Sequence, residues 1–387
     1  MKMAMVRNKK PKNEKKLENT KINKSNSGFL EKNSFHQMLL CIGEYSSKII
    51  MQDTFRNKKG AFSYPLLAGK FSKDVSEWSQ SIINQKYILS LEKNVDSHFW
   101  YQILPVFSEN NVLIDNLKKS SIDKIKGVIM ISSLWDGFGS ALTPTLISQF
   151  NESNTNTIVF GIMPSQVQTS DAHFNAFSSI GLCLSKNFAP IVLLDRDQLE
   201  TFSGIDHQGS IIKGSSVVNF LLDLIQKKES FVQEITELTR AFNVRHYTVM
   251  LSSGASLSVY GSLENILNAA LLRPLLKFKL SSSNIVYVIF RIPARMKKKL
   301  TKNNIELSVA NWFKEKTNLN SIEISEPIYI DSKEDRIDIA LFVGGFELAD
   351  IFIPIKKKIQ RVKNNAIKKG LIKKKEWEAI AKELSSN

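Results

Sequence analysis

The sequence predicts an α/β fold with a parallel-sheet domain, a long central helix and a smaller second α/β domain. Three observations predict it. Short runs rich in β-branched residues alternate with helical patterns between residues 127 and 194, as in chains that form βα units. A helical pattern with a wide apolar face then spans residues 215–239. The alternation restarts at residue 247, which predicts the second domain.

The first domain is predicted from apolar strands. A short apolar run bounded by turn residues is typical of a strand buried on both faces of a parallel sheet. Such runs occur at residues 36–43, 127–132, 157–163 and 190–194. Helical patterns at residues 142–150 and 171–184 separate the last three runs. Pro144 is expected in the first turn of its helix, where proline is tolerated.

The second domain is predicted to be an independent layer of strands and helices. Strand patterns occur at residues 247–260 and 285–292, and helical patterns occur at residues 262–276 and 307–317. The last two strand patterns are expected to form an antiparallel hairpin, because a short polar segment joins them. These two patterns lie at residues 322–330 and 336–344.

The chain is expected to divide into five segments. The first is a basic disordered tail, and the second is a nucleotide-binding-type domain. A central helix, the second α/β domain and a basic helical tail follow, with Gly370 as a helix stop inside that tail. The expected boundaries are residues 1–34, 35–213, 214–240, 241–355 and 356–387.

The net charge of +16 comes from the two ends of the chain. Residues 1–28 carry nine Lys or Arg against two Glu, and residues 356–387 carry eleven against three. The segment between them is nearly neutral. A basic nucleic-acid-binding face on the folded body is therefore not expected, whereas the two ends could attract an anionic partner.

Signals for export and for metal binding are not found. The N-terminal segment lacks the apolar core of a signal peptide, so we expect a cytoplasmic protein. Cys41 and Cys183 lie in apolar runs and are expected to be buried thiols. The histidines show no metal-ligand spacing, so no metal site is predicted.

A glycine-containing turn at residues 135–141 separates a predicted strand from a predicted helix. Gly137, Gly139 and Ser140 lie in it, next to Asp136. Backbone N–H groups and the helix dipole converge at such a turn and can bind phosphate. The same glycines also suit a tight turn without any ligand, and both interpretations stay open.

Several local motifs, taken in order, resemble the tubulin/FtsZ superfamily, with the archaeal CetZ/FtsZ-like branch the most similar. The glycine-containing turn matches the phosphate loop of that superfamily. Five further stretches fit its pattern in the correct order. They are Met163-Pro164-Ser165, Leu194-Asp195-Arg196-Asp197, Asn219, Ala270 to Leu276, and Gly344-Gly345-Phe346-Glu347. The resemblance implies a Rossmann-like nucleotide-binding domain, GTP as ligand, and Mg²⁺ only together with GTP.

The resemblance also implies a set of nucleotide-binding residues, if that function is retained. They are Gly43, Gly137, Gly139, Ser140, Arg196 and Asn219. The family pattern is damaged, because Trp135 and Asp136 replace glycines and Phe138 replaces a threonine. GTP binding is therefore expected to be weak or absent.

Two of these residues have open alternatives. Arg196 stands where the family has an asparagine, and it could approach a phosphate or pair with Asp195 or Asp197. Asn219 could read guanine, or it could be an ordinary polar group of its helix.

No catalytic residue is predicted. Members of the family supply acidic residues after the central helix to the nucleotide of the next subunit. Here no Asp or Glu occurs between Glu237 and Glu264. Arg240, Asn243 and Arg245 lie in that stretch and are interface candidates. Arg240 and Arg245 could face Glu44 and Asp136 of a neighbour. Arg245, with His246, could instead be an ordinary surface residue at the start of a strand.

Three functions are compatible with these features. The first is a cytoskeletal subunit that assembles head to tail with itself or a tubulin/FtsZ-like paralogue. The second is a non-catalytic scaffold that docks to an anionic membrane or nucleic acid through residues 1–28 and 356–387. The third is a divergent active GTPase.

Overall fold

The computed structural model describes residues 37–53, 65–79, 87–109, 127–186 and 189–385. The predicted basic tail at residues 1–34 lies outside this part of the chain. Within the described residues, no helix is both long and apolar enough to cross a membrane.

The first half of the fold is a parallel sheet, as the sequence predicts. Its spatial order is β3-β2-β1-β4-β5-β6, and every neighbouring pair is parallel. The strands are β1 (Gln37–Ile42), β2 (Leu66–Gly69), β3 (Ile88–Ser90), β4 (Gly127–Ser133), β5 (Asn156–Met163) and β6 (Ile191–Asp195). The helices are α1 (Glu44–Asp53), α2 (Ser72–Trp78), α3 (Trp100–Glu109), α5 (Gly137–Glu152), α6 (Ser170–Lys186) and α7 (Arg196–Thr201).

Both faces of this sheet are covered, which explains the unbroken apolar runs. In β4, Val128 and Met130 belong to a core shared with α3, α5 and α6. The alternate residues Ile129 and Ile131 belong to a second core on the opposite face. Since successive side chains of a strand point to opposite faces, a strand between two cores must be apolar throughout.

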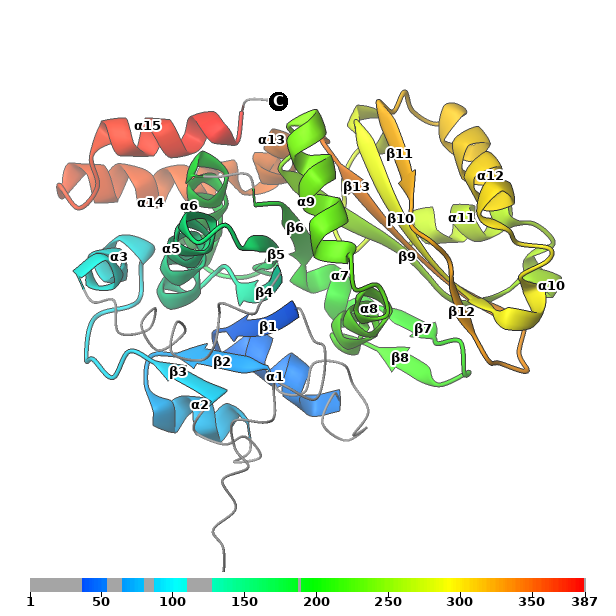
Figure 1. The fold of residues 1–387 in the computed structure, drawn as a ribbon. Helices are drawn as coiled ribbons and strands as arrows, with labels where there is room; N and C mark the ends of the chain where they lie inside the picture. The colour runs from blue at the N-terminus through cyan, green and yellow to red at the C-terminus, as the bar shows by residue number, and fades with distance from the viewer. Residues whose placement is uncertain (1–36, 54–64, 80–86, 110–126, 187–188, 386–387) are drawn as a thin grey trace, which may run out of the picture. The chain divides into compact units, whose positions relative to one another are not determined.

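The second half continues the same sheet rather than forming the independent layer that the sequence predicts. β9 (His246–Ser256) pairs in parallel with β6, and the order then runs β9-β13-β10-β11. The further strands are β10 (Ile285–Pro293), β11 (Ser321–Ile324), β12 (Ile328–Ile330) and β13 (Arg336–Gly344). The helices are α10 (Leu257–Tyr260), α11 (Leu263–Leu271), α12 (Lys302–Lys314) and α13 (Leu348–Phe352), with 3₁₀ turns at Leu280–Ser282, Ala294–Met296 and Ile353–Ile355. Figure 1 shows this sheet running through both halves.

The predicted terminal hairpin is wrong. β11 and β12 both pair in parallel with β10, whereas β13 lies between β9 and β10 and is antiparallel to both. Burial explains this arrangement. Eight of the nine residues of β13 are buried, whereas all three residues of β12 are half-buried. A strand that is apolar on both faces is stabilised by a central position, which pairing with β12 at the edge would not provide.

The predicted single central helix is two helices. α8 (Ser216–Gln226) and α9 (Phe231–Phe242) are separated by four polar residues. None of these four residues has an apolar side chain to add to the core, and the Ser230 hydroxyl bonds the Glu234 carboxylate at 2.5 Å. Phe231 then begins α9 fully buried against the rings of Tyr287 and Phe342. The short strands β7 (Ser203–Ile205) and β8 (Ile211–Lys213) form a hairpin before α8.

The C-terminal segment, expected as a basic helical tail, is a helical hairpin packed on the first domain. Its helices are α14 (Lys356–Lys368) and α15 (Lys374–Glu383), joined through Gly370 with a φ of +67°. Its apolar side chains, which include Ile359 and Ile380, are part of the core that contains α6. Figure 1 shows α14 and α15 beside α6.

Candidate functional site

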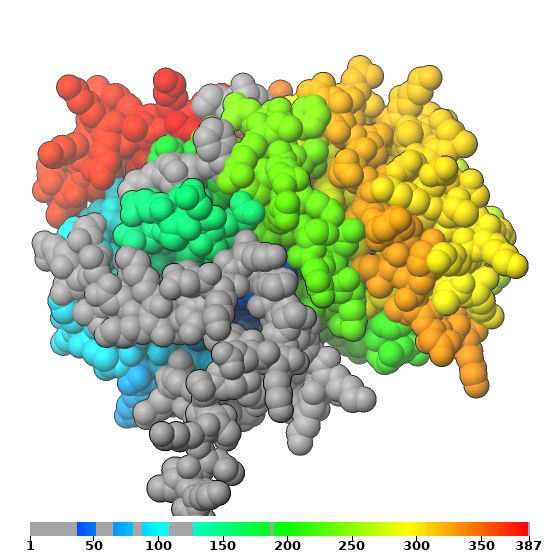
Figure 2. All heavy atoms as spheres, in the orientation of Figure 1, coloured from blue at the N-terminus to red at the C-terminus, as the bar shows by residue number. Residues whose placement is uncertain are grey.

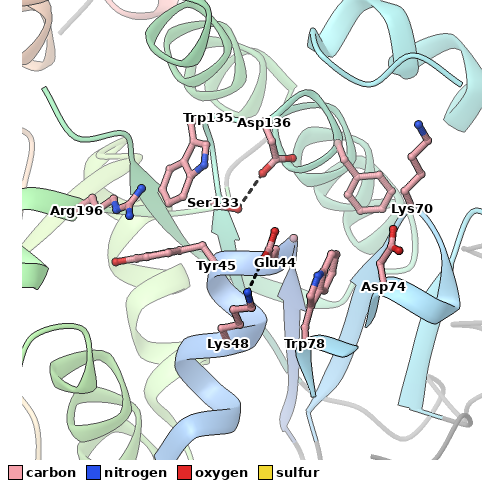
Figure 3. A pocket seen from close by; sticks show the side chains of 12 residues that line it. Glu44, Tyr45, Lys48, Lys70, Asp74, Trp78, Ser133, Trp135, Asp136 and Arg196 are labelled. Atoms are coloured by element: carbon pink, nitrogen blue, oxygen red, sulfur yellow. Dashed lines mark hydrogen bonds and ion pairs between the residues drawn. The ribbon is translucent and has the colours of Figure 1, made fainter. Parts of the chain in front are cut away.

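A hollow of about 430 Å³ lies where β1 and β4 end and where α1 and α5 begin (Figure 3). Its lining combines aromatic side chains with charges of both signs. The aromatic residues are Tyr45, Trp78, Trp135 and Phe138, and the charged residues are Glu44, Lys48, Lys70, Asp74, Asp136 and Arg196. Gly43 and Ser133 complete the wall. Of the six nucleotide-binding residues that the resemblance implies, Gly43 and Arg196 line this hollow.

Asp136 caps the N-terminus of α5. Its Oδ1 accepts a hydrogen bond from the Gly139 N–H at 2.6 Å, and its Oδ2 accepts one from the Ser133 hydroxyl at 3.0 Å. Burial raises the pKa of Asp136, while these hydrogen bonds oppose the rise. The helix end that attracts anions therefore already has the protein's own carboxylate as its anion.

This cap also explains why α5 begins at Gly137 rather than at Leu142, where the sequence pattern places the start. Gly137, Gly139 and Ser140 consequently lie in the first turn of the helix. Pro144 lies in the interior, not in the predicted first turn. The Ser140 hydroxyl donates to the Asp136 carbonyl at 2.6 Å, so it bonds the backbone of its own helix.

The first two glycines of α5 are enclosed by protein. A Cβ on Gly137 would lie 2.2 Å from the carbonyl oxygen of Ser97, and one on Gly139 would lie 2.3 Å from that of Ser133. Both neighbours are backbone, which cannot move aside. These glycines are therefore required by close packing, and the surface against Gly137 is covered by the segment that contains Ser97 and Phe99.

Asn175 of α6 holds that covering segment in place. Its side-chain amide donates to the His98 carbonyl at 2.8 Å and to the Trp135 carbonyl at 3.1 Å. Its Oδ1 accepts from the Trp100 N–H at 3.3 Å. Asn175 is 1% exposed. The buried Asn175 amide therefore joins the segment at His98 and Trp100 to Trp135, which lies just before the start of α5.

Gly43 forms the turn between β1 and α1. Its φ of +85° is a left-handed conformation that glycine adopts without strain, and its N–H donates to the Ala68 carbonyl at 3.0 Å. A Cβ there would lie 2.7 Å from the Ser133 hydroxyl. The next residue, Glu44, forms an ion pair with Lys48 one turn later in α1, as Figure 3 shows.

Arg196 lies against an aromatic pair on the opposite wall. Its guanidinium carbon is 4.7 Å from the Tyr45 ring centroid and 5.3 Å from that of Trp135. The two rings meet edge to face, with centroids 4.9 Å apart. Glu200 accepts a hydrogen bond from the Tyr45 hydroxyl at 2.6 Å and lies 3.8 Å from Arg196. Cation–π contacts thus fix Arg196 to the wall.

The expected pairing of Arg196 with Asp195 or Asp197 is not what the structure shows. Asp195 accepts from the Asp197 N–H at 2.8 Å and caps α7. Asp197 accepts from the Gln166 N–H at 2.9 Å. Both carboxylates accept hydrogen bonds from backbone N–H groups, and the ion pair of Arg196 is with Glu200 instead.

Asn219 lies on α8, outside the residues that line the hollow. Its side-chain amide donates to the Ile49 carbonyl of α1 at 2.8 Å. The structure therefore gives Asn219 a role in joining α8 to α1. Gly137, Gly139 and Ser140 likewise lie outside the lining.

The three interface candidates lie together at the end of α9. Asn243 is the C-cap of α9 with a φ of +52°, and Arg240 is exposed, 3.4 Å from the Asn156 side chain. Arg245 is engaged within the chain, because it pairs with Glu383 of α15 at 3.0 Å and also donates to the Leu184 carbonyl. Arg245 therefore anchors the C-terminal hairpin.

The residues present do not fit the phosphates of a nucleotide at the start of α5. A phosphate there would meet the Asp136 carboxylate, whereas the family pattern provides open glycine N–H groups. Within the described part of the chain, no three His, Cys, Asp or Glu side chains are grouped so that they could hold a metal ion.

Sequence reasoning missed two groups at this site. The capping role of Asp136 had a local signal, since an Asp three residues before an unpaired helical N–H is a common N-cap arrangement. The cluster of Tyr45, Trp135 and Arg196 had none, because its members come from three separate elements.

The structure resembles solved structures of tubulin/FtsZ-type proteins. CetZ from Methanosaeta thermophila strain DSM 6194 has a TM-score of 0.65 at 13% identity, covering 89% of this chain and 96% of that one. CetZ2 from Haloferax volcanii, in a GTPγS-bound protofilament, has 0.60 at 13%, with 84% and 99% covered. TubZ from Clostridium botulinum phage c-st has 0.57 at 13%, with 86% and 99% covered.

The class of protein follows from these likenesses: the chain has the tubulin/FtsZ fold. The resemblance stated from the sequence is confirmed at this level. No protein-family model and no curated protein sequence matches the chain.

Proposed function

We propose that the protein is a tubulin/FtsZ-like cytoskeletal subunit that assembles head to tail and binds GTP weakly or not at all. One observation carries this proposal. The fold is kept, yet the helix end that would hold phosphate has the Asp136 carboxylate as its anion. Bringing a polyphosphate there costs like-charge repulsion and the loss of a helix cap.

Hydrolysis is proposed to be lost with binding. The stretch after Glu237 has no carboxylate that could polarise water in a neighbour, and Mg²⁺ would enter only with GTP. A divergent GTPase is the alternative, and it would need acidic residues from elsewhere in the fold.

The two ends of the parallel sheet support head-to-tail assembly. The hollow lies at the carboxyl ends of β1 and β4. Arg240 and Asn243 lie at the opposite end, because β9 follows them directly and runs parallel to β6. A contact between opposite ends of two copies is heterologous and produces open filaments. The protofilament of CetZ2 is consistent with this proposal.

Reversing the charge of Arg240, the exposed arginine among the interface candidates, tests head-to-tail assembly. We expect the full-length protein to sediment as filaments equally with and without GTP, and Arg240→Glu to lower the sedimented fraction. Arg361→Glu is the matched control, since Arg361 is exposed on α14. Assembly that requires GTP would contradict the proposal, and so would a chain that stays monomeric at every concentration, alone and mixed with a tubulin/FtsZ-like paralogue.

Docking to an anionic membrane or nucleic acid is the second candidate function. The observation that favours it is the run of exposed lysines in the C-terminal hairpin, at positions 373, 374 and 375. Replacing all three by Gln should reduce sedimentation with anionic vesicles, or retention of DNA, if this function is real. If the variant and the wild type bound equally, these lysines of the hairpin would not be the docking site.

A further inference from the structure

The C-terminal hairpin is fixed to the first domain by aromatic stacking. The Trp377 ring lies nearly parallel to the Phe174 ring at 5.3 Å and to the Phe177 ring at 5.1 Å, both from α6. Ile380 contacts α6 so closely that a Cβ on Gly181 would lie 2.6 Å from its Cγ2. With the pairing of Arg245 and Glu383, these contacts hold the hairpin in one position.

A groove of about 670 Å³ runs between α14 and α15. The residues that line it recur at helical spacing along each helix, so they form one side of the hairpin. Ile367, Trp377 and Ala381 give the groove an apolar part, and all three are buried or half-buried. In Figure 2 the atoms of the hairpin, drawn in red, lie at the surface in this view.

Lysines surround that apolar part. Lys363, Lys368, Lys374 and Lys382 line the groove, and Glu378 is the one acidic residue among its lining residues. Glu378 lies 3.7 Å from Lys374, so a single lysine compensates it. An apolar strip bordered by a net positive charge attracts a partner that is apolar along one side and acidic along its edges.

We propose that this groove is the docking site for an acidic, amphipathic segment of a partner protein. α15 spans ten residues, or about 15 Å, which matches about three turns of a helix lying along it. Leucine-like side chains of the segment reach Ile367 and Ala381, and its carboxylates meet the lysines. This mode is the docking of an amphipathic helix into a groove.

The geometry favours a protein segment over a flat membrane. The apolar residues of the groove are recessed, and Leu371, 51% exposed, is the one exposed large apolar side chain among the described residues of the hairpin. A helix that binds the membrane interface instead presents a continuous apolar face to the acyl chains. A flat lipid surface cannot reach the recessed side chains.

Nucleic acid fits less well for a related reason. Single strands bind through stacking of bases on exposed aromatic rings. Trp377 is the only aromatic residue in residues 356–387, and it is 9% exposed with its ring stacked on two phenyl rings of α6. The basic segment at residues 1–28 is excluded as an occupant by its own positive charge.

A fluorescence-polarisation experiment with the full-length protein tests this groove. The probe is a labelled synthetic helix of about 14 residues made of Glu and Leu in an amphipathic order. We expect saturable binding that weakens when salt rises from about 50 to about 300 mM. Two matched probes, one with Lys for Glu and one with Ser for Leu, should bind at least about tenfold more weakly.

Two pairs of charge-reversal variants test whether the probe binds in the groove. Lys368→Glu with Lys374→Glu, in the groove, should weaken the Glu/Leu probe at least about tenfold. Lys356→Glu with Lys357→Glu makes the same charge change on exposed residues outside the lining and should have little effect. Ala381→Phe, which fills the apolar part without changing charge, should also weaken binding.

Three results would overturn the proposal. The first is equal binding of the Leu and Ser probes, since that would mean charge attraction alone. The second is equal loss in the two charge-reversal pairs. The third is displacement of the probe by vesicles with about 30% phosphatidylserine, or by single-stranded DNA, at concentrations below those of the unlabelled peptide. None of these readouts depends on filament assembly or GTP.

Discussion

From the sequence, the turn at residues 135–141 could bind phosphate or be a tight turn without a ligand, and the C-terminal segment is expected to be a basic helical tail. The structure sets the two regions apart. The turn is closed from within by Asp136 and covered by the segment at Ser97. The hairpin is docked on α6 and has an open groove of about 670 Å³ between its helices.

This difference teaches that a residue pattern does not by itself determine what a segment contacts. Glycines permit a close approach, but the approaching group can be protein backbone as well as phosphate. A basic helix is compatible with solvent on all sides, but an apolar stripe such as Ile359, Val362 and Ala366 predicts a partner surface. Each of the following predictions tests one side of this comparison.

The largest effect is expected at Trp377. Because this ring is stacked on α6, Trp377→Ala should lower the free energy of unfolding by about 3 kcal/mol or more, measured by chemical denaturation. Leu371→Ala is the control on the same hairpin, and since Leu371 is 51% exposed, its effect should stay within about 0.5 kcal/mol. Equal and small losses of unfolding free energy in the two variants would contradict the packing of the hairpin on α6.

A smaller loss is expected at Gly137. The methyl of Gly137→Ala would meet the Ser97 backbone, so the variant should lose about 1–3 kcal/mol of stability. Gly127→Ala is the matched control. The atoms nearest to its Cβ would be those of the Val232 side chain, at 3.1 Å or more, so a shift of a few tenths of an ångström relieves the contact. If Gly137→Ala proved as stable as the control, the close contact between Gly137 and the Ser97 backbone would be contradicted.

The smallest effect is expected at the helix cap. Asp136→Ala should cost about 1 kcal/mol, whereas Asp136→Asn keeps an acceptor for the Gly139 N–H and should cost less. Burial raises the pKa of Asp136, so the fold holds this proton more tightly than the unfolded chain does. The stability this provides is present at low pH and is lost as pH rises through the folded pKa.

The Asn variant lacks that titration. The stability of the wild type relative to Asp136→Asn should therefore fall as pH rises above the ordinary Asp pKa of about 4. Thermal unfolding of both proteins at a series of pH values measures this difference. A difference that stays constant with pH, or that grows with pH, would contradict a raised pKa of Asp136 in the folded protein.

The sequence predicted the parallel sheet because local pattern determines it. The runs in β4, β5 and β6 are apolar on both faces, and the helical periods between them require parallel crossovers. The order of the motifs then sufficed to identify the fold.

Features set by distant contacts were not predictable in the same way. The position of β13 between β9 and β10 depends on which strand is buried on both faces, and the parallel β11 and β12 have no local marker. The cluster of Tyr45, Trp135 and Arg196 joins residues up to 151 positions apart. The start of α5 was predicted at Leu142 rather than Gly137 because the pattern of apolar residues does not show the capping carboxylate of Asp136.

Equilibrium binding of labelled GTP to the full-length protein, with Mg²⁺ present, tests the central claim most directly. The Asp136 carboxylate at the start of α5 predicts no saturable binding up to about 1 mM GTP. Saturable binding with a Kd of about 10 µM or tighter would contradict it, because that affinity requires the phosphates to reach the helix end that Asp136 caps.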